Sequence, residues 1–103
     1  MIVIALRSEN KNMEIPPQLR ENYVRRRCED LESCKTALKN NEFEKIEVIG
    51  HQMKGNGLTF GFEEIANLGA HLESAAKEKN SPSLSELMIE FSRIVTKITP
   101  SKG

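Results

Sequence analysis

A histidine, a lysine and a glycine stand close together at the centre of the chain, in the run GHQMKGNG at residues 50–57. If this run is helical, residues three and four positions apart share one face, so His51, Lys54 and Gly55 are neighbours in space. An imidazole can act as a nucleophile, an ammonium can hold an anion beside it, and a glycine leaves room for a large molecule to approach. The spacing therefore indicates a nucleophile with a cation and open backbone next to it.

The apolar pattern around this run indicates which way His51 points. The spacing of a buried stripe is shown by Ile46, Ile49, Met53, Gly57 and Phe60. At about 100° per residue, His51 points about 160° away from the mean direction of that stripe. We therefore expect His51 to stand in solvent, with Gly55 on the same outward side and Lys54 on its flank.

Two aliphatic residues, Val48 and Leu58, also fall on the outward side of this helix. Exposed aliphatic residues around an exposed histidine indicate a surface that another protein covers. We predict that Gly55, Val48 and Leu58 form this docking surface. The alternative is that Val48 and Leu58 are half-exposed residues of a helical bundle.

Four amphipathic segments are expected to position the surface. The breaks Asn40-Asn41, Gly61 and Asn80-Ser81-Pro82 divide the chain into helices at 17–39, 42–60, 62 or 63 to 79, and 83–98. Because the connections are short, the pattern predicts an all-α fold, an antiparallel up-down four-helix bundle. Glycines in the second and third helices, Gly57 and Gly69 among them, indicate close approach of neighbouring helices, since each costs about 1 kcal/mol against alanine.

Helix starts are expected at sequence signals for capping. Asn41 with Glu44 resembles a capping box before the second helix. Ser83 with Glu86 resembles one before the last helix, and Ser81 followed by Pro82 is a rival start.

The first residues differ from the rest of the chain. An apolar run from Ile2 to Leu6 has no second strand to pair with, so residues 1–14 are expected to form a short apolar arm packed on a bundle of residues 15–103. A swapped or dimer-forming arm is the alternative. The run is too short to span a membrane and lacks the pattern of a signal peptide.

Composition sets further expectations. With 103 residues, one domain with one core is expected, and the formal net charge of zero implies no general attraction to nucleic acid or to a membrane. Cys28 and Cys34 are too close on one helix to pair, which favours a reduced, cytoplasmic environment. His51 and His71 belong to no cluster with the spacing of metal ligands, so no metal site is expected. A monomer is expected.

Three consecutive arginines, Arg25 to Arg27, stand in the first helix. The plain interpretation is a solvated face with one side chain lying along apolar surface. The other interpretation is an electrostatic contact with an acidic surface of a partner.

Around His51 the sequence resembles the histidine phosphotransfer (HPt) domain family. The family pattern is a histidine, two residues, Lys-Gly, a second glycine and a later Leu-Glu pair. Here these are His51, Lys54-Gly55, Gly61 and Leu72-Glu73, and the resemblance is best from about residue 38 to 76. Asn56-Gly57 stands where many members carry two small residues, and the arm is not a general family feature.

The resemblance implies a phosphocarrier of a two-component phosphorelay rather than an enzyme. His51 would accept a phosphoryl group from a receiver-domain phospho-aspartate and pass it on, Lys54 would stabilise the phosphoryl group, and Gln52 could hydrogen-bond near the site. Response-regulator receivers, or a hybrid sensor kinase, are the implied partners. No cofactor is implied for this chain, because the Mg²⁺ belongs to the receiver. A free imidazole titrates near pH 6.5, so an exposed one is largely neutral at physiological pH, as a nucleophile must be.

Plainer alternatives remain open. One is a receiver-binding inhibitor or scaffold module that does not transfer phosphate. Another is a helical dimerisation domain in which the motif is incidental. Within the motif, Glu73 is expected to make a structural contact with a neighbouring helix, and His71 is expected to be a structural or surface residue.

Overall fold

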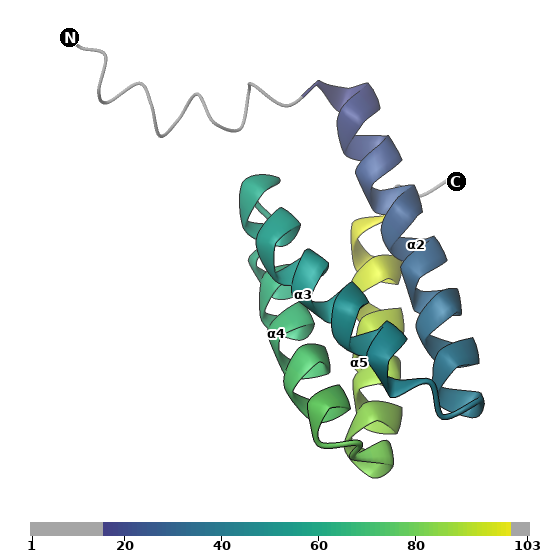
Figure 1. The fold of residues 1–103 in the computed structure, drawn as a ribbon. Coiled ribbons are helices and arrows are strands. Elements are labelled where there is room, and N and C mark those ends of the chain that lie inside the picture. Colours follow the sequence, from purple (N-terminus) through teal and green to yellow (C-terminus); the bar gives the residue numbers. More distant parts are fainter. Residues whose placement is uncertain (1–15, 100–103) are drawn as a thin grey trace, which may run out of the picture.

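Four helices make up the computed structural model, which describes residues 16–99 (Figure 1). In chain order they are α2 (Pro17–Lys39), α3 (Phe43–Thr59), α4 (Glu63–Lys77) and α5 (Ser81–Ile98). The predicted all-α class and the four predicted helices are confirmed. The observed ends lie within two residues of the predicted ones. The predicted arm at residues 1–14 lies outside the described residues.

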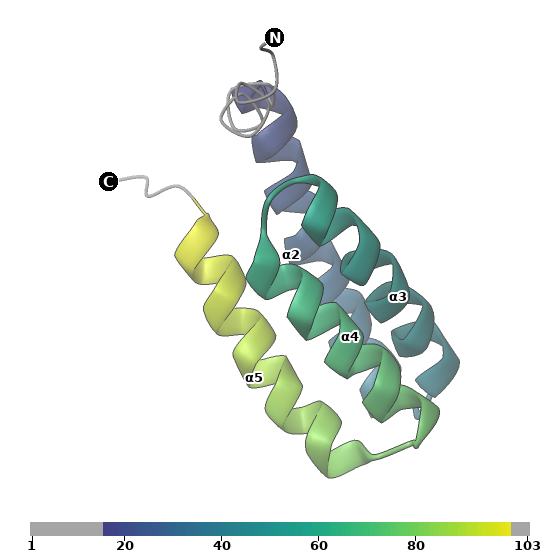
Figure 2. The same ribbon diagram turned by 90° about the vertical axis from the view of Figure 1, so that its left-hand side faces the viewer.

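The helices run up and down and close into a ring. Each helix packs against the next in the chain, and α5 returns to α2, so that α3 and α5 lie at opposite corners (Figure 2). The pair α3 and α4 is the most closely packed of the four. This is the predicted antiparallel bundle. None of the helices within residues 16–99 is both long and apolar enough to cross a membrane.

The core is built from the apolar stripes of all four helices. Its largest fully buried side chains are Phe91, Ile46, Met53, Ile65, Leu72, Leu84 and Cys34. Among the polar residues in this interior is Arg27, which pairs with Asp30 at 2.8 Å and lies over the ring of Tyr23. Arg27 is therefore the arginine of the triplet that lies along apolar surface, whereas Arg25 and Arg26 are exposed.

Both predicted capping boxes are wrong. Asn41 has a φ of 57°, in the left-handed region, and α3 begins at Phe43 without a side-chain cap. A capping side chain must start from extended backbone to reach the free N–H groups of the first turn, and Asn41 instead ends the turn after α2. At α5 the cap is Asn80, whose side-chain oxygen accepts a hydrogen bond from the Ser83 amide at 3.1 Å. The helix thus begins at Ser81, close to the rival start.

Glycines explain why α3 and α4 lie so close together. A Cβ atom at Gly69 would stand 2.6 Å from the carbonyl oxygen of Gly50 and 2.6 Å from the amide nitrogen of Lys54. A Cβ atom at Gly57 would stand 2.6 Å from the amide nitrogen of Ala66. Atoms cannot approach so closely, so the two backbones can be in contact only where side chains are missing. The close approach predicted at Gly57 and Gly69 is confirmed.

Candidate functional site

His51 lies in the middle of α3 with 66% of its side chain exposed. The predicted exposure is confirmed. One ring nitrogen, Nδ1, lies 3.1 Å from Oε2 of Glu73 on α4. The edge of the ring that carries Nδ1 is thus held by the neighbouring helix.

Glu73 also binds the lysine of the motif. Its other carboxylate oxygen, Oε1, lies 3.0 Å from Nζ of Lys54, and its side chain is only 15% exposed. The hydrogen bond from Lys54 is the main reason that the pKa of Glu73 falls below its usual value, and the contact with His51 lowers this pKa further. One ionised carboxylate therefore bridges the histidine and the lysine.

This bridge determines the tautomer of His51. An ionised carboxylate can only accept hydrogen bonds, so Nδ1 must carry the proton that Glu73 accepts. In the neutral ring the other nitrogen, Nε2, then keeps its lone pair. The arrangement leaves Nε2 with a free lone pair on an exposed ring.

The close contact of α3 and α4 is what brings Glu73 to this position. A Cβ atom at Gly50 would stand 2.7 Å from the backbone nitrogen of Glu73. With any larger residue at position 50, the start of the Glu73 side chain would be pushed away from α3. Gly50 thus allows a carboxylate on α4 to reach a histidine and a lysine on α3.

The predicted docking residues lie around the ring. Apart from the adjoining residues and backbone of α3 itself, no atom lies within 4 Å of the position that a Cβ would take at Gly55, so the surface beside His51 is open. Val48 and Leu58 are 54% and 64% exposed. Gln52 is exposed as well, but it lies on the side of α3 that faces α2, and no hydrogen bond joins it to His51 among the described residues.

Two residue roles could not be seen in the sequence. Glu73 does contact a neighbouring helix, as expected, but the contact is with the motif itself. Asn56, which stands in place of a small residue, accepts a hydrogen bond of 2.6 Å from the Tyr23 hydroxyl and ties α3 to α2. Only the register between helices reveals these pairs, and the sole sequence signal was the Leu-Glu pair of the resemblance.

Comparison with known proteins agrees with this geometry. Residues 18–98 match the family model described as the Hpt domain, so the chain belongs to the Hpt domain family. Its members are phosphocarrier modules of two-component phosphorelays, which work through histidine phosphotransfer and interact with response-regulator receiver domains. No curated protein and no solved structure matches the chain significantly.

Proposed function

We propose that His51 is the phosphoacceptor of this chain, taking a phosphoryl group from the phospho-aspartate of one receiver domain and giving it to another. The observation that carries the proposal is the bridge from Glu73, which accepts a hydrogen bond from Nδ1–H and so leaves Nε2 free on an exposed ring. A histidine that served only as a surface residue would need neither the largely buried carboxylate of Glu73 nor the glycines that bring this carboxylate close to the ring.

In the transfer step, the Nε2 lone pair attacks the phosphorus, an N–P bond forms, and the bond from phosphorus to the aspartate oxygen breaks. The electrons of that bond leave with the aspartate carboxylate. The positive charge that the ring gains is shared with Nδ1–H, which faces the negative carboxylate of Glu73. Return of the group to a second receiver reverses these steps.

Lys54 supplies positive charge where phosphoryl oxygens arrive. Phosphoryl transfer depends mainly on alignment and on compensation of negative charge. The side chain of Lys54 is 46% exposed, and Lys54 and His51 both contact the carboxylate of Glu73. Its flexible ammonium can turn from the carboxylate toward the phosphoryl group.

The open backbone at Gly55 and the exposed side chains of Val48 and Leu58 form the proposed docking surface. The missing side chain lets the acidic pocket of a receiver approach the imidazole. We assign the Mg²⁺ of the reaction to that pocket. Within residues 16–99 no cluster of three histidine, cysteine or acidic residues could hold a metal ion.

The test is phosphate transfer from receiver domains that have been phosphorylated with labelled acetyl phosphate. The wild-type chain should gain label that is labile in acid and stable in alkali, as expected for phosphohistidine. His51→Gln should gain none, and the matched variant His71→Gln should gain as much as the wild type. Label that persists in His51→Gln would overturn the assignment. Binding of receivers without any label would instead identify a non-transferring binding module.

A further inference from the structure

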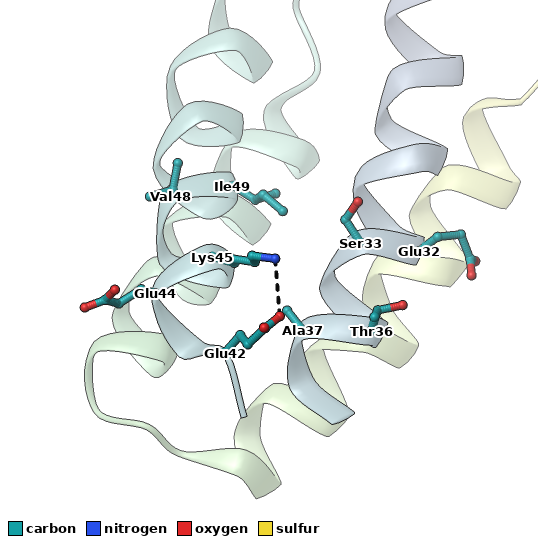
Figure 3. A pocket seen from close by; sticks show the side chains of 9 residues that line it. All are labelled: Glu32, Ser33, Thr36, Ala37, Glu42, Glu44, Lys45, Val48 and Ile49. Carbon is teal, nitrogen blue, oxygen red and sulfur yellow. Dashed lines mark ion pairs between the residues drawn. The ribbon is translucent and has the colours of Figure 1, made fainter. Parts of the chain in front are cut away.

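A groove with acidic residues on its rim lies along the seam between α2 and α3. It has a volume of about 740 Å³, and the residues that matter for its chemistry are Glu32, Glu42, Glu44, Lys45, Val48 and Ile49. Figure 3 shows Ile49 pointing into this groove, with Glu44 and Glu32 at its outer edges and Lys45 paired with Glu42. We call it the acidic groove. Because Val48 belongs to it, the acidic groove is continuous with the docking surface around His51.

A second groove follows the same seam at the other end of α3. It has a volume of about 640 Å³, and its walls include Leu19, Arg26, Arg27, Gln52, Asn56 and Phe60. Arg26 is the exposed arginine of this group, since Arg27 is buried against Tyr23. We call it the basic groove. Gln52, one residue after His51, joins it to the docking surface.

His51 is level with the residue of α2 at which the charge changes sign. The Tyr23 hydroxyl contacts Asn56 and the Ala37 carbonyl contacts the Glu42 amide, so the same interval separates the two contacts on both antiparallel helices. Five residues back from Asn56 is His51, and five residues on from Tyr23 is Cys28. Cys28 separates the arginine triplet from Glu29 and Asp30.

The two halves of the helix pair α2 and α3 therefore carry opposite charge. Residues 17–27 of α2 contain four arginines against one glutamate, and residues 51–59 of α3 add Lys54 and no acid. Residues 29–50, which form the other half, contain six acidic residues against three lysines. The net charge of zero conceals this separation.

A partner would meet these two ends as separate charges. In the register above, Arg26 of α2 is level with Met53 of α3. Met53 is nine residues from Glu44, so Arg26 and Glu44 are about 14 Å apart along the helix axis. That distance exceeds the screening length of about 8 Å at physiological salt. Neither side chain has an ion-pair partner among residues 16–99, so both are available to a bound protein.

We propose that the two grooves select and orient the receiver domain that docks over His51. The receiver places an acidic surface against the basic groove and a basic surface against the acidic groove, so that its phospho-aspartate arrives over the imidazole in one orientation. The inference rests on the proposed function, since it names the partner surface of the same site. Arg26 and Glu44 are its specificity-determining residues, and neither takes part in the transfer step.

The test exchanges the two charges without changing the net charge. The double variant Arg26→Glu/Glu44→Lys inverts the polarity of the face. Its control is the double variant Arg93→Glu/Glu86→Lys, which makes the same exchange of one positive and one negative charge on α5. This helix lies at the corner of the bundle opposite α3. The second-order rate of transfer is measured with each phosphorylated receiver domain of the source organism that labels the wild type.

Charges at the rim of an interface act mainly on association and are screened by salt. For the receiver with the fastest transfer, Arg26→Glu/Glu44→Lys should lower the transfer rate about tenfold at ~50 mM salt and only about twofold at ~0.5 M. The control should stay within about twofold of the wild-type rate at both salt concentrations. Equal transfer rates for Arg26→Glu/Glu44→Lys and its control would overturn the inference while leaving His51 as phosphoacceptor. Persistent label in His51→Gln would instead overturn the proposed function.

Discussion

The two histidines of this chain, His51 on α3 and His71 on α4, are both exposed, yet only one has a built environment. Nδ1 of His51 faces a carboxylate that also holds a lysine. For His71, no hydrogen bond or ion pair is present among residues 16–99. Exposure alone therefore does not set the two histidines apart, whereas a partner that fixes the protonated nitrogen does.

The difference depends on backbone contact between α3 and α4, so the largest effect should follow from separating them. Gly69→Ala places a methyl group 2.6 Å from backbone atoms of α3, which should lower the free energy of unfolding by about 1–3 kcal/mol. Transfer to His51 should fall with it, because Glu73 moves away. Urea unfolding and label uptake measure the two effects.

Gly55→Ala is the matched control, because its methyl group meets no atom within 4 Å apart from the adjoining residues and backbone of α3 itself. As an exposed helical position it should gain up to about 1 kcal/mol in the free energy of unfolding. A Gly69→Ala variant as stable as Gly55→Ala would show that the close contact of α3 and α4 does not depend on glycine.

The next largest effect should come from removing the negative charge of Glu73, the partner that His51 has and His71 lacks among residues 16–99. Glu73→Gln can donate as well as accept, so Nδ1 is no longer required to carry the proton. Transfer should slow by roughly tenfold, since a catalytic group that is no longer held in one state is misplaced part of the time. Glu86→Gln, on α5, serves as the control.

A spectroscopic measurement separates this role from a merely structural one. In the wild type, ¹⁵N NMR should show more Nδ1–H tautomer for neutral His51 than for neutral His71. In Glu73→Gln the two rings should become alike. A wild-type spectrum in which both histidines already have the same tautomer would contradict the bridge.

The smallest effect concerns the ionisation of Glu73. Its pKa is lowered chiefly by the hydrogen bond from Lys54, so Lys54→Met should raise it toward the ordinary value of 4.5. A carboxyl with a depressed folded-state pKa stabilises the fold above its unfolded pKa and loses that contribution as pH falls through the depressed value. The stability difference between wild type and Lys54→Met should therefore be present at neutral pH and vanish in acid. ¹³C NMR of the carboxyl group, followed against pH, gives both pKa values.

Much of this architecture could be predicted from residue patterns. The apolar stripes gave the four helices, because a helix must bury one face. The angle between His51 and that stripe gave its exposure. The capping boxes failed because several neighbouring polar residues can begin a helix, and the backbone angles of the turn decide among them. The sequence alone does not distinguish an asparagine with left-handed backbone, such as Asn41, from an asparagine that caps a helix.

By itself, the sequence determined the bundle, the outward direction of His51 and the nearness of Lys54 and Gly55, because all of these follow from periodicity within one helix. Only the tertiary structure decided that Glu73 bridges His51 and Lys54, that Asn56 binds Tyr23, and that the charge of α2 changes sign level with the histidine. Each of these depends on the register between two helices. Between α3 and α4 that register is set by where glycines let the backbones touch. Between α2 and α3 it is seen in side-chain contacts such as Tyr23 with Asn56. Spacing along one helix contains neither.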